Sequence, residues 1–493
     1  MALRTREQYM EALSKMNKNV YHNGKLIDRL DPIQMGAINV MATSYDMALD
    51  PANADLYLAK SHLTGKTISR FTHIHQSTDD LHKKQEMTRH LCNQMGICCQ
   101  RCMGIDAANA VNAVSYEAQK RPTAKTKYYD NFLKWLEYFQ ENDLIASCAQ
   151  TDVKGDRMKR PGQQIDPDMY VHVVEEREDG IIVSGSKVHI SEASVSDEIV
   201  VVPVRSLVPG EEAYAVSFAI PSDYPGIKQI MHHHNPKDRI EYKRGFDFGA
   251  TDSYIIFDNT FIPWDRVFLC GERDLGSTLA LLFALFHRHS YSGCKPATLD
   301  YTIGLASLTA KVNGIRKAPQ TRRALSELIM IGELGYAAGY IASDLGKPEV
   351  YMPGVGLVPF GPGAYIPNSI YCNVGRCLTG EGVWKEHEIL CDLAGGLPAT
   401  YPDETDFLSE ETSAYAKKYT RRNWDMDIED QIKFWLQFID YTTGQNATSI
   451  TYGAFHGGGS PVMEQIAITT QYDIKSKEDI VRKIAGMNME DEK

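Results

Sequence analysis

The chain has 493 residues, of which 43% are hydrophobic and 24% are charged, and its formal net charge is −12. An acidic balance without long runs of Lys or Arg excludes general nucleic-acid binding, because a phosphate backbone requires a basic surface. No apolar stretch reaches the length of a membrane span, and the first residues lack the apolar core of a signal peptide. We therefore expect a cytoplasmic protein that does not bind membranes.

Residue patterns divide the chain into three parts. Apolar residues recur at helical spacing up to about residue 145, short β-rich runs follow between 146 and 275, and long helical patterns return from 276. We predict an N-terminal α-helical domain over 1–145, a middle β domain over 146–275 and a C-terminal helical bundle over 276–493. This α+β order is typical of the acyl-CoA dehydrogenase architecture, in which flavin lies between the middle domain and the bundle.

Ten cysteines in a chain of this length do not indicate a disulfide framework, since a large core supplies the stability that bridges give to small secreted domains. Four of them, Cys92, Cys98, Cys99 and Cys102, fall within eleven residues. If the segment after Cys98 is helical, Cys98 and Cys102 project from one face and Cys99 points elsewhere.

A second segment carries His287, Tyr291 and Cys294 at positions i, i+4 and i+7. These side chains share one face if the helix continues through Gly293. Two helices would then bring three thiols and one imidazole together, a donor set that suits zinc or an iron–sulfur cluster. Helix positions seven apart lie about 10 Å apart along the axis, which favours a wide cluster over one ion. Six other cysteines are interpreted as small buried hydrophobes: Cys92, Cys148, Cys270, Cys372, Cys377 and Cys391.

Other polar motifs fit either a functional role or an ordinary structural one. TDVKGDR at 151–157 offers backbone donors at a turn and Arg157 for an anionic partner such as a flavin, or it forms a solvated loop. His73 and His75 either reach the site or lie in the core, and the core is favoured. The run His232–His234, which precedes Asn-Pro in a polar stretch, is expected on the surface.

Several motifs carry a resemblance to a known family. They are RFTHIHQSTDDLHKK at 70–84, CCQRCMGIDAANAV at 98–111, TDVKGDR at 151–157, IIFDNTFIPWDRVF at 255–268, HRHSYSGCK at 287–295 and HGGGSP at 456–461. Together they resemble the 4-hydroxybutyryl-CoA dehydratases within the 4-hydroxyphenylacetate 3-hydroxylase flavoprotein family. The Cys-x₃-Cys and His-x₆-Cys pairs are the part that is specific to the dehydratases.

The resemblance implies an acyl-CoA lyase with a radical mechanism, FAD and one [4Fe–4S] cluster per subunit, assembled as a homotetramer (a dimer of dimers). It maps the cluster ligands to Cys98, Cys102, His287 and Cys294. It maps further catalytic roles to Gln100, Tyr291, Lys295 and Asp252, beside a proton-accepting role for His287. Flavin contacts are expected from Thr151, Asp152, Lys154, Gly155, Asp156, Arg157 and Ser191.

The sequence departs from the family pattern at two carboxylates. Asp252 stands where the family has a Glu, and Gly453 stands where the family has a catalytic Glu. A hydroxide leaving group needs an acid, whereas a quaternary amine needs room and aromatic faces, which Tyr452, Phe455 and Tyr291 would supply. We therefore favour release of trimethylamine from 4-trimethylammoniobutyryl-CoA (γ-butyrobetainyl-CoA), with crotonyl-CoA as the product.

Three alternatives stay open. The chain is a 4-hydroxybutyryl-CoA dehydratase and vinylacetyl-CoA Δ-isomerase if another residue replaces the missing Glu. A flavin monooxygenase of the 4-hydroxyphenylacetate 3-hydroxylase type would share the fold but would not use the cluster ligands. A non-catalytic scaffold would hold a structural zinc ion instead.

Overall fold

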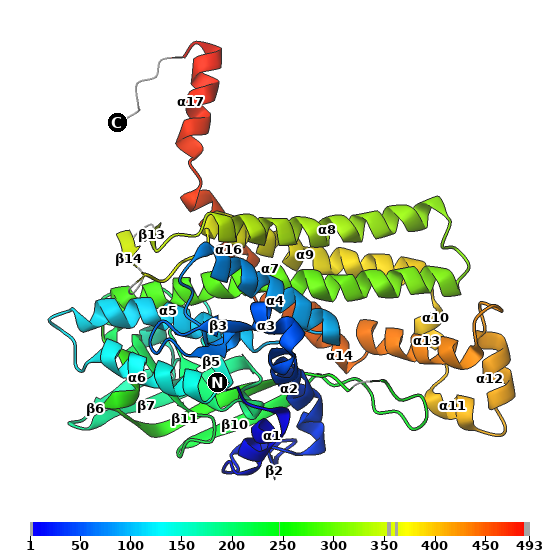
Figure 1. Cartoon of the computed structure of the whole chain (residues 1–493), viewed down its shortest axis with the longest axis horizontal. Coiled ribbons are helices and arrows are strands. Elements are labelled where there is room, and N and C mark those ends of the chain that lie inside the picture. The colour runs from blue at the N-terminus through cyan, green and yellow to red at the C-terminus, as the bar shows by residue number, and fades with distance from the viewer. Residues whose placement is uncertain (1–2, 246, 353–355, 360–362, 488–493) are drawn as a thin grey trace.

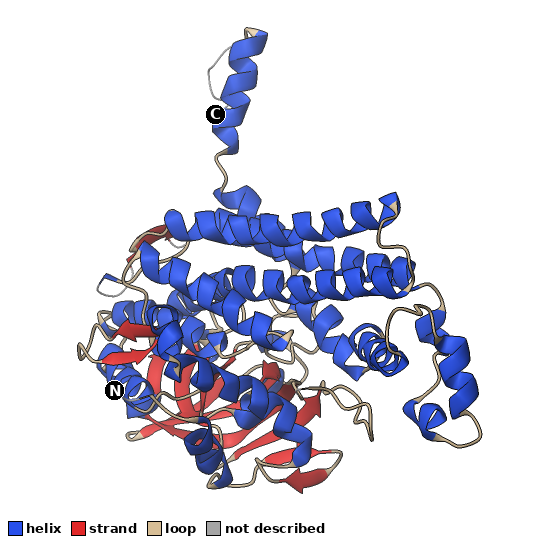
Figure 2. Cartoon of the chain, turned by 45° about the vertical axis from the view of Figure 1, so that its right-hand side comes forward, coloured by secondary structure: helices blue, strands red, loops and turns tan. Residues whose placement is uncertain are grey.

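A computed structural model describes residues 3–245, 247–352, 356–359 and 363–487. Two layers dominate the molecule: a β region packs beneath a group of long helices that run side by side (Figures 1 and 2). The chain is a mixed α/β protein with helical regions before and after most of its strands. This agrees with the order of helices, strands and helices predicted from the sequence.

The β region consists mainly of two sheets. The six-stranded sheet has the order β2-β1-β10-β11-β7-β6, and the four-stranded sheet has the order β12-β9-β8-β5. The strands of the first sheet are β1 (Val20–His22), β2 (Lys25–Ile27), β6 (His172–Glu176), β7 (Gly180–Ser191), β10 (Ile227–His233) and β11 (Thr251–Pro263). Those of the second are β5 (Ala146–Ala149), β8 (Glu198–Val201), β9 (Val216–Pro221) and β12 (Val267–Cys270). Strands β1 and β2 come from the N-terminal part of the chain, for which the sequence indicated mainly helices.

Burial explains the two sheets. Strand β10 alternates buried and exposed residues, so one of its faces meets the core and the other meets solvent. Every residue of β5, β8 and β12 is buried, because the four-stranded sheet lies between the large sheet and helices. Two small hairpins complete the strands: β3 (Leu58–Lys60) pairs with β4 (Thr67–Ser69), and β13 (Glu349–Met352) pairs with β14 (Gly356–Pro359).

Helices of the N-terminal part pack beside the sheets and against the C-terminal bundle. They are α1 (Arg6–Ser14), α2 (Met35–Leu49), α3 (Ala54–Tyr57), α4 (Thr78–Met95), α5 (Cys102–Gln119) and α6 (Tyr128–Glu141). Ser77 caps the start of α4, and Gly96 ends it in the left-handed conformation that favours glycine. Helix α4 therefore stops just before the cysteine-rich segment.

Three long helices form the C-terminal bundle: α7 (Arg273–Val312), α8 (Pro319–Asp344) and α9 (Ser369–Ala394). Helix α7 contains Pro296, whose missing N–H leaves the carbonyl of Ser292 without its usual partner. The side chain of Gln85 on α4 donates to that carbonyl at 3.3 Å. A Cβ on Gly293 would overlap the backbone of Gln85, so glycine permits this close contact between α4 and α7.

Shorter helices follow the bundle. They are α10 (Leu397–Thr400), α11 (Glu404–Leu408), α12 (Ser413–Thr420), α13 (Ile428–Thr442), α14 (Gln445–Thr448), α15 (Ala454–His456), α16 (Pro461–Gln471) and α17 (Ile474–Ala485), with a π-helical turn at Ser449–Gly453. Helix α17 extends away from the rest of the chain (Figures 1 and 2) and buries none of its residues. Among the described residues, no helix combines the length and apolar character needed to cross a membrane.

Candidate active site

Five cysteines gather in one buried cluster between α4, α5 and α7. Cys92, Cys98, Cys99, Cys102 and Cys294 pack together with Tyr291. Hydrogen bonding between the Cys98 and Cys294 thiols lowers the pKa of Cys98 well below its usual value and raises that of Cys294. A thiolate at Cys98 is the species that binds metal ions.

The route by which Cys98 reaches this cluster differs from the prediction. Helix α5 begins only at Cys102, and Gln100 has a φ of 51°, so Cys98 and Cys102 are not one helical turn apart. Cys99 was expected to point elsewhere, yet its thiol interacts with that of Cys102. A left-handed turn at Gln100, rather than a shared helix face, brings these thiols together.

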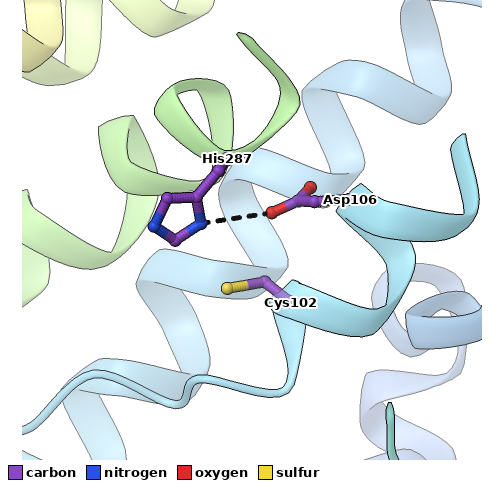
Figure 3. Close-up of side chains that lie close together, drawn as sticks. All are labelled: Cys102, Asp106 and His287. Carbon is purple, nitrogen blue, oxygen red and sulfur yellow. Dashed lines mark ion pairs between the residues drawn. The ribbon is translucent and has the colours of Figure 1, made fainter. Parts of the chain in front are cut away.

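His287 projects from α7 toward the start of α5. Its imidazole, the Cys102 thiol and the Asp106 carboxylate offer ligand atoms that all lie within 4.8 Å of one another (Figure 3). Asp106 Oδ2 lies 3.5 Å from His287 Nδ1. Burial lowers the pKa of His287, but the Asp106 carboxylate and the Cys102 thiol together raise it to about 9.

Asp106 is a site residue that sequence reasoning missed. Its carboxylate is fully buried, accepts from Lys84 Nζ at 2.5 Å, and accepts from Ser290 Oγ at 2.9 Å. The signal was present: Asp106 is an acid one turn after Cys102, in a helix otherwise rich in alanine and other small residues. A carboxylate held in this way orients the histidine beside it, as the carboxylate partners of metal-binding histidines do in metalloproteins.

Helix α7 continues through Gly293 as predicted, so His287, Tyr291 and Cys294 do lie on one continuous helix. With Cys98 and Cys102 they bring three thiols and one imidazole into a single buried region. This donor set fits a metal cluster. The tighter trio of Cys102, Asp106 and His287 is the set that would suit one ion.

Tyr291 on α7 contacts the segment that leads into HGGGSP. The Tyr291 hydroxyl donates to the carbonyl of Ala454. Arg376 on α9 lies over the Tyr291 ring at 4.4 Å and donates to the carbonyl of Phe455 at 2.5 Å. A Cβ on Gly458 would overlap the Arg376 side chain, which explains the glycine at this position. The segment after residue 452 is therefore fixed against α7 and α9.

Lys295 is paired inside the bundle. Its ammonium group lies 3.2 Å from Glu386 Oε2, and both side chains are buried. The second oxygen of Glu386 has no hydrogen-bond partner among the described residues. Burial raises the pKa of Tyr291, and Glu386 contributes to that rise. Glu386, which sequence reasoning missed, thus places a carboxylate near two of the predicted catalytic residues.

Asp252 forms the centre of a hydrogen-bonded chain between the sheet and the C-terminal helices. Strand pairing sets Asp252 opposite Ser191, whose hydroxyl donates to it at 2.6 Å. His234 Nε2 lies 2.8 Å from the other oxygen, and His234 Nδ1 lies 2.8 Å from Thr448 Oγ1. Burial raises the pKa of Asp252, but hydrogen bonds from His234 and Ser191 outweigh it and lower the pKa. The surface position expected for His234 is wrong: it is only 8% exposed, because it bridges two parts of the chain.

Glu192 forms a second carboxyl group beside Asp252. It is buried and accepts from the hydroxyl of Thr251 at 3.1 Å. Burial, followed by the Asp252 charge, raises the pKa of Glu192 well above its usual value. Two adjacent carboxyl groups with opposite pKa shifts are typical of sites that move protons. The sequence offered no signal for Glu192.

The predicted flavin-contacting turn is positively charged on one side. Burial lowers the pKa of Lys154, and Arg157 and Arg205 lower it further, because these cations lie near one another. None of the three forms an ion pair with a described residue. Asp152 instead faces inward, where it pairs with Lys187 at 2.8 Å and accepts from the backbone of Val171. Unpaired cations fit an anionic ligand.

Comparison with known proteins identifies the family. The model of the 4-hydroxyphenylacetate 3-hydroxylase N-terminal region matches residues 5–269, and the model of its C-terminal region matches residues 277–486. The chain belongs to the 4-hydroxyphenylacetate 3-hydroxylase family. This confirms the family expected from the motifs.

Individual members of the 4-hydroxyphenylacetate 3-hydroxylase family narrow the comparison. The chain is 37% identical to a 4-hydroxybutyryl-CoA dehydratase/vinylacetyl-CoA-Δ-isomerase from Clostridium aminobutyricum, over 98% of this chain and all of that protein. An oxygen-tolerant archaeal 4-hydroxybutyryl-CoA dehydratase from N. maritimus is 31% identical, with a TM-score of 0.91 over 100% of this chain and 96% of that one. The oxygenase component of 4-hydroxyphenylacetate 3-monooxygenase, solved with FAD, shares the fold at 22% identity, with a TM-score of 0.82 and 98% of each chain covered.

Gly453, which stands where a Glu was expected from the family, has free space around it. Gly453 is exposed, and a Cβ built on it would approach no atom outside its immediate neighbours more closely than 3.7 Å. Its φ of −61° suits any residue, so neither space nor backbone conformation requires glycine. Trp384 on α9 lies beside it, with ring centroids 5.9 Å from Tyr452 and 5.5 Å from Phe455. Two of the three predicted aromatic residues, Tyr452 and Phe455, thus form a group with Trp384. Among the described residues, the ring of Tyr291 does not contact the rings of this group.

Proposed function

We propose that the chain is an FAD- and [4Fe–4S]-dependent lyase that removes the C4 substituent of a 4-substituted butyryl-CoA and gives crotonyl-CoA. The observation that carries this proposal is the convergence of Cys98, Cys102 and Cys294 with His287 in one buried region. The similarity to 4-hydroxybutyryl-CoA dehydratases supports a hydroxide leaving group, hence 4-hydroxybutyryl-CoA as the first substrate to test. Vinylacetyl-CoA Δ-isomerisation would accompany this activity.

The two cofactors have fitting residues. Cys98, Cys102, Cys294 and His287 would hold the cluster, and Asp106 would orient His287. Lys154, Arg157 and Ser191 would contact FAD, in an acyl-CoA dehydrogenase-like arrangement between the sheets and the bundle. When bound, the flavin supplies one-electron oxidation of the substrate enolate, and the cluster supplies a Lewis acid toward the leaving group.

The chain's own side chains would handle the protons. Asp252 is held ionised by His234 and Ser191, so it would accept a proton from substrate carbon. The ammonium of Lys295 and the hydroxyl of Tyr291 would stabilise the thioester oxygen as negative charge develops on it. Gln100, held in a left-handed turn between two ligands, would fix the geometry of that turn.

A homotetramer in the cytoplasm is the assembly we propose. Helix α17 projects from the chain with Ile480, Val481 and Ile484 exposed by 54%, 61% and 81%. Helix α8 exposes Met330 and Leu334 by 51% and 57%. Such apolar surface on one chain favours burial against further copies.

Metal, flavin and activity measurements on anaerobically purified protein test the proposal. We expect about four iron and four sulfide per chain, bound flavin, and formation of crotonyl-CoA from 4-hydroxybutyryl-CoA. Zinc without flavin would instead identify a scaffold. Flavin without iron, together with oxygen-dependent hydroxylation of a phenol, would identify a monooxygenase.

A second candidate substrate is 4-trimethylammoniobutyryl-CoA, with trimethylamine as the leaving group. The exposed space at Gly453 and the aromatic group of Trp384, Tyr452 and Phe455 favour it, because a quaternary ammonium ion binds to aromatic faces. Turnover of both thioesters should be compared in the same preparation. Rapid turnover of the hydroxy compound with none of the ammonio compound would rule out amine release.

Gly453→Glu provides a matched test of the leaving group. The new carboxyl group should reduce turnover of the ammonio compound by filling the open space, and should raise turnover of the hydroxy compound by supplying an acid. Equal effects on both substrates would contradict any role of this position in choosing the leaving group.

A further inference from the structure

A cavity outside the candidate active site lies between the loop that joins β10 to β11 and helix α13. Its volume is about 280 Å³. The lining residues are Arg239, Tyr242, Lys243, Arg244, Gly245, Lys433, Phe434, Leu436, Gln437 and Asp440. None of these residues has a role in the site described above.

The cavity is strongly basic, although the whole chain is acidic. Four cationic side chains and one carboxylate line it, and that carboxylate, Asp440, is already paired with Arg239 at 2.9 Å. Lys243, Arg244 and Lys433 form no ion pair with any described residue. Three unpaired cations around one cavity fit a ligand with several negative charges.

Arg244 is the best-placed of these cations to bind a ligand. Its Nε donates to the side chain of Gln437, which fixes the guanidinium group. The side chain is half-buried, and burial lowers its pKa by more than the nearby Tyr301, Asp440 and Asp247 raise it. A fixed guanidinium with free N–H groups suits the bidentate recognition of phosphate.

The cavity is connected to the Asp252 site through two elements. The loop leaves the site at His234 and returns to it at Thr251, directly before Asp252. Helix α13 leads into α14, where Thr448 contacts His234. From Asn235 to Arg239 an extended chain covers at most about 17 Å, so the cavity and the site lie within reach of one long ligand.

The loop is held firmly enough to form a binding surface. Glu404 of α11 accepts hydrogen bonds from the backbone of Ile240 and Tyr242 at 2.7 and 2.8 Å. Lys237 pairs with Asp403 at 2.5 Å. Figure 1 shows the loop running from the sheet toward α11 and α13. The backbone that precedes Lys243 and Arg244 is therefore held against α11.

We propose that this cavity binds the 3′-phosphorylated adenosine diphosphate end of coenzyme A, and that the pantetheine arm runs from it to the Asp252 site. The ligand carries several phosphate charges for Arg244, Lys243 and Lys433, and an aromatic base that suits the ring of Phe434. This inference rests on the proposed function for its choice of ligand. It adds the residues that distinguish a coenzyme A thioester from a shorter thioester.

Titration calorimetry on the whole protein, with coenzyme A and with 3′-dephospho-coenzyme A, tests the proposal. Wild-type protein should bind coenzyme A about tenfold more tightly than the dephospho compound, since one charge-assisted contact is lost. Arg244→Gln should weaken coenzyme A about tenfold and bring the two affinities together. Lys433→Ala, at a more exposed position, should weaken coenzyme A about threefold.

Lys228→Ala is the matched control, because Lys228 is an exposed lysine of β10 that does not line the cavity. It should leave both affinities unchanged. Equal affinities of wild type, Arg244→Gln and Lys433→Ala for coenzyme A would overturn the proposal, as would the absence of binding to the wild type. Melting temperatures of the variants identify any that fold poorly.

The two proposals fail in different ways. If coenzyme A binds as expected but no 4-substituted butyryl-CoA is turned over, the cavity assignment stands and the proposed reaction does not. If the thioester is turned over with a KM that Arg244→Gln leaves unchanged, the reaction stands and the cavity assignment is wrong.

Discussion

The cysteine–histidine centre and the Gly453 segment are two regions of one proposed site with opposite character. At the first, Cys102, Asp106 and Lys84 are almost completely buried and each contacts another functional group. At the second, Tyr452 is 64% exposed and Trp384 is 45% exposed, and the backbone passes through a π-helical turn. The buried region allows little change, whereas the open region can change without loss of the fold. Residues that choose the leaving group are therefore best sought at the open region.

Removing one of the proposed cluster ligands from the buried centre should have the largest effect. Cys98→Ser should remove the cluster, because a hydroxyl does not replace a thiolate, and should lower activity by about 100-fold or more. Iron and sulfide content and the visible absorption spectrum measure the loss. Cys391→Ser is the control, since Cys391 is exposed and lies outside the cluster. Full iron content in Cys98→Ser would contradict the ligand assignment.

Asp106→Asn should have the next largest effect. Lys84 would remain buried without its anion, and breaking a buried ion pair costs about 3–5 kcal/mol. The free energy of unfolding in urea measures this cost. Glu11→Gln, which breaks the exposed Lys15–Glu11 pair, should leave the free energy of unfolding almost unchanged. Similar losses of unfolding free energy in both variants would contradict a stabilising role of the buried Asp106–Lys84 pair.

His234→Gln should shift the pH dependence of activity. His234 helps to lower the pKa of Asp252, so its loss should raise that pKa, and the acid limb of kcat/KM should move to higher pH. The pKa of Asp252 is lower in the folded than in the unfolded protein. The Asp252–His234 contact therefore stabilises the fold above the unfolded-state pKa, and this stabilisation is lost as the pH falls through the folded-state pKa. Other titratable groups near Asp252 are His189, His232 and Glu192. An unchanged acid limb would show that His234 serves only to hold the fold.

Trp384→Ala should have the smallest effect and the most selective one. Loss of a cation–π contact costs about 0.5–2 kcal/mol, which raises the KM for 4-trimethylammoniobutyryl-CoA by roughly 2- to 30-fold. The KM for 4-hydroxybutyryl-CoA should not change, because that substrate has no cation. Tyr419→Ala, at an exposed aromatic residue of α12, is the control. Equal changes for both thioesters would contradict an ammonium-binding role.

Residues that repeat along one helix were predictable, whereas most contacts between distant segments were not. Spacing alone indicated that His287, Tyr291 and Cys294 share a helix, and the glycine between them did not interrupt it. The turn at Gln100 was missed, because good helix formers follow Cys98 and a left-handed residue leaves no pattern in sequence. Glu192 and Glu386 were missed because their roles depend on partners such as Thr251 and Lys295, which lie far away in the chain. Asp106 could have been found from its place one turn after Cys102.

Helix α17 has a consequence for handling the protein. It has twelve residues and buries none of them, and an isolated helix of that length is marginally stable in water. Its order therefore depends on contact with another surface and should decrease on dilution. Protease cleavage near Tyr472, between α16 and α17, would then increase as the protein concentration falls.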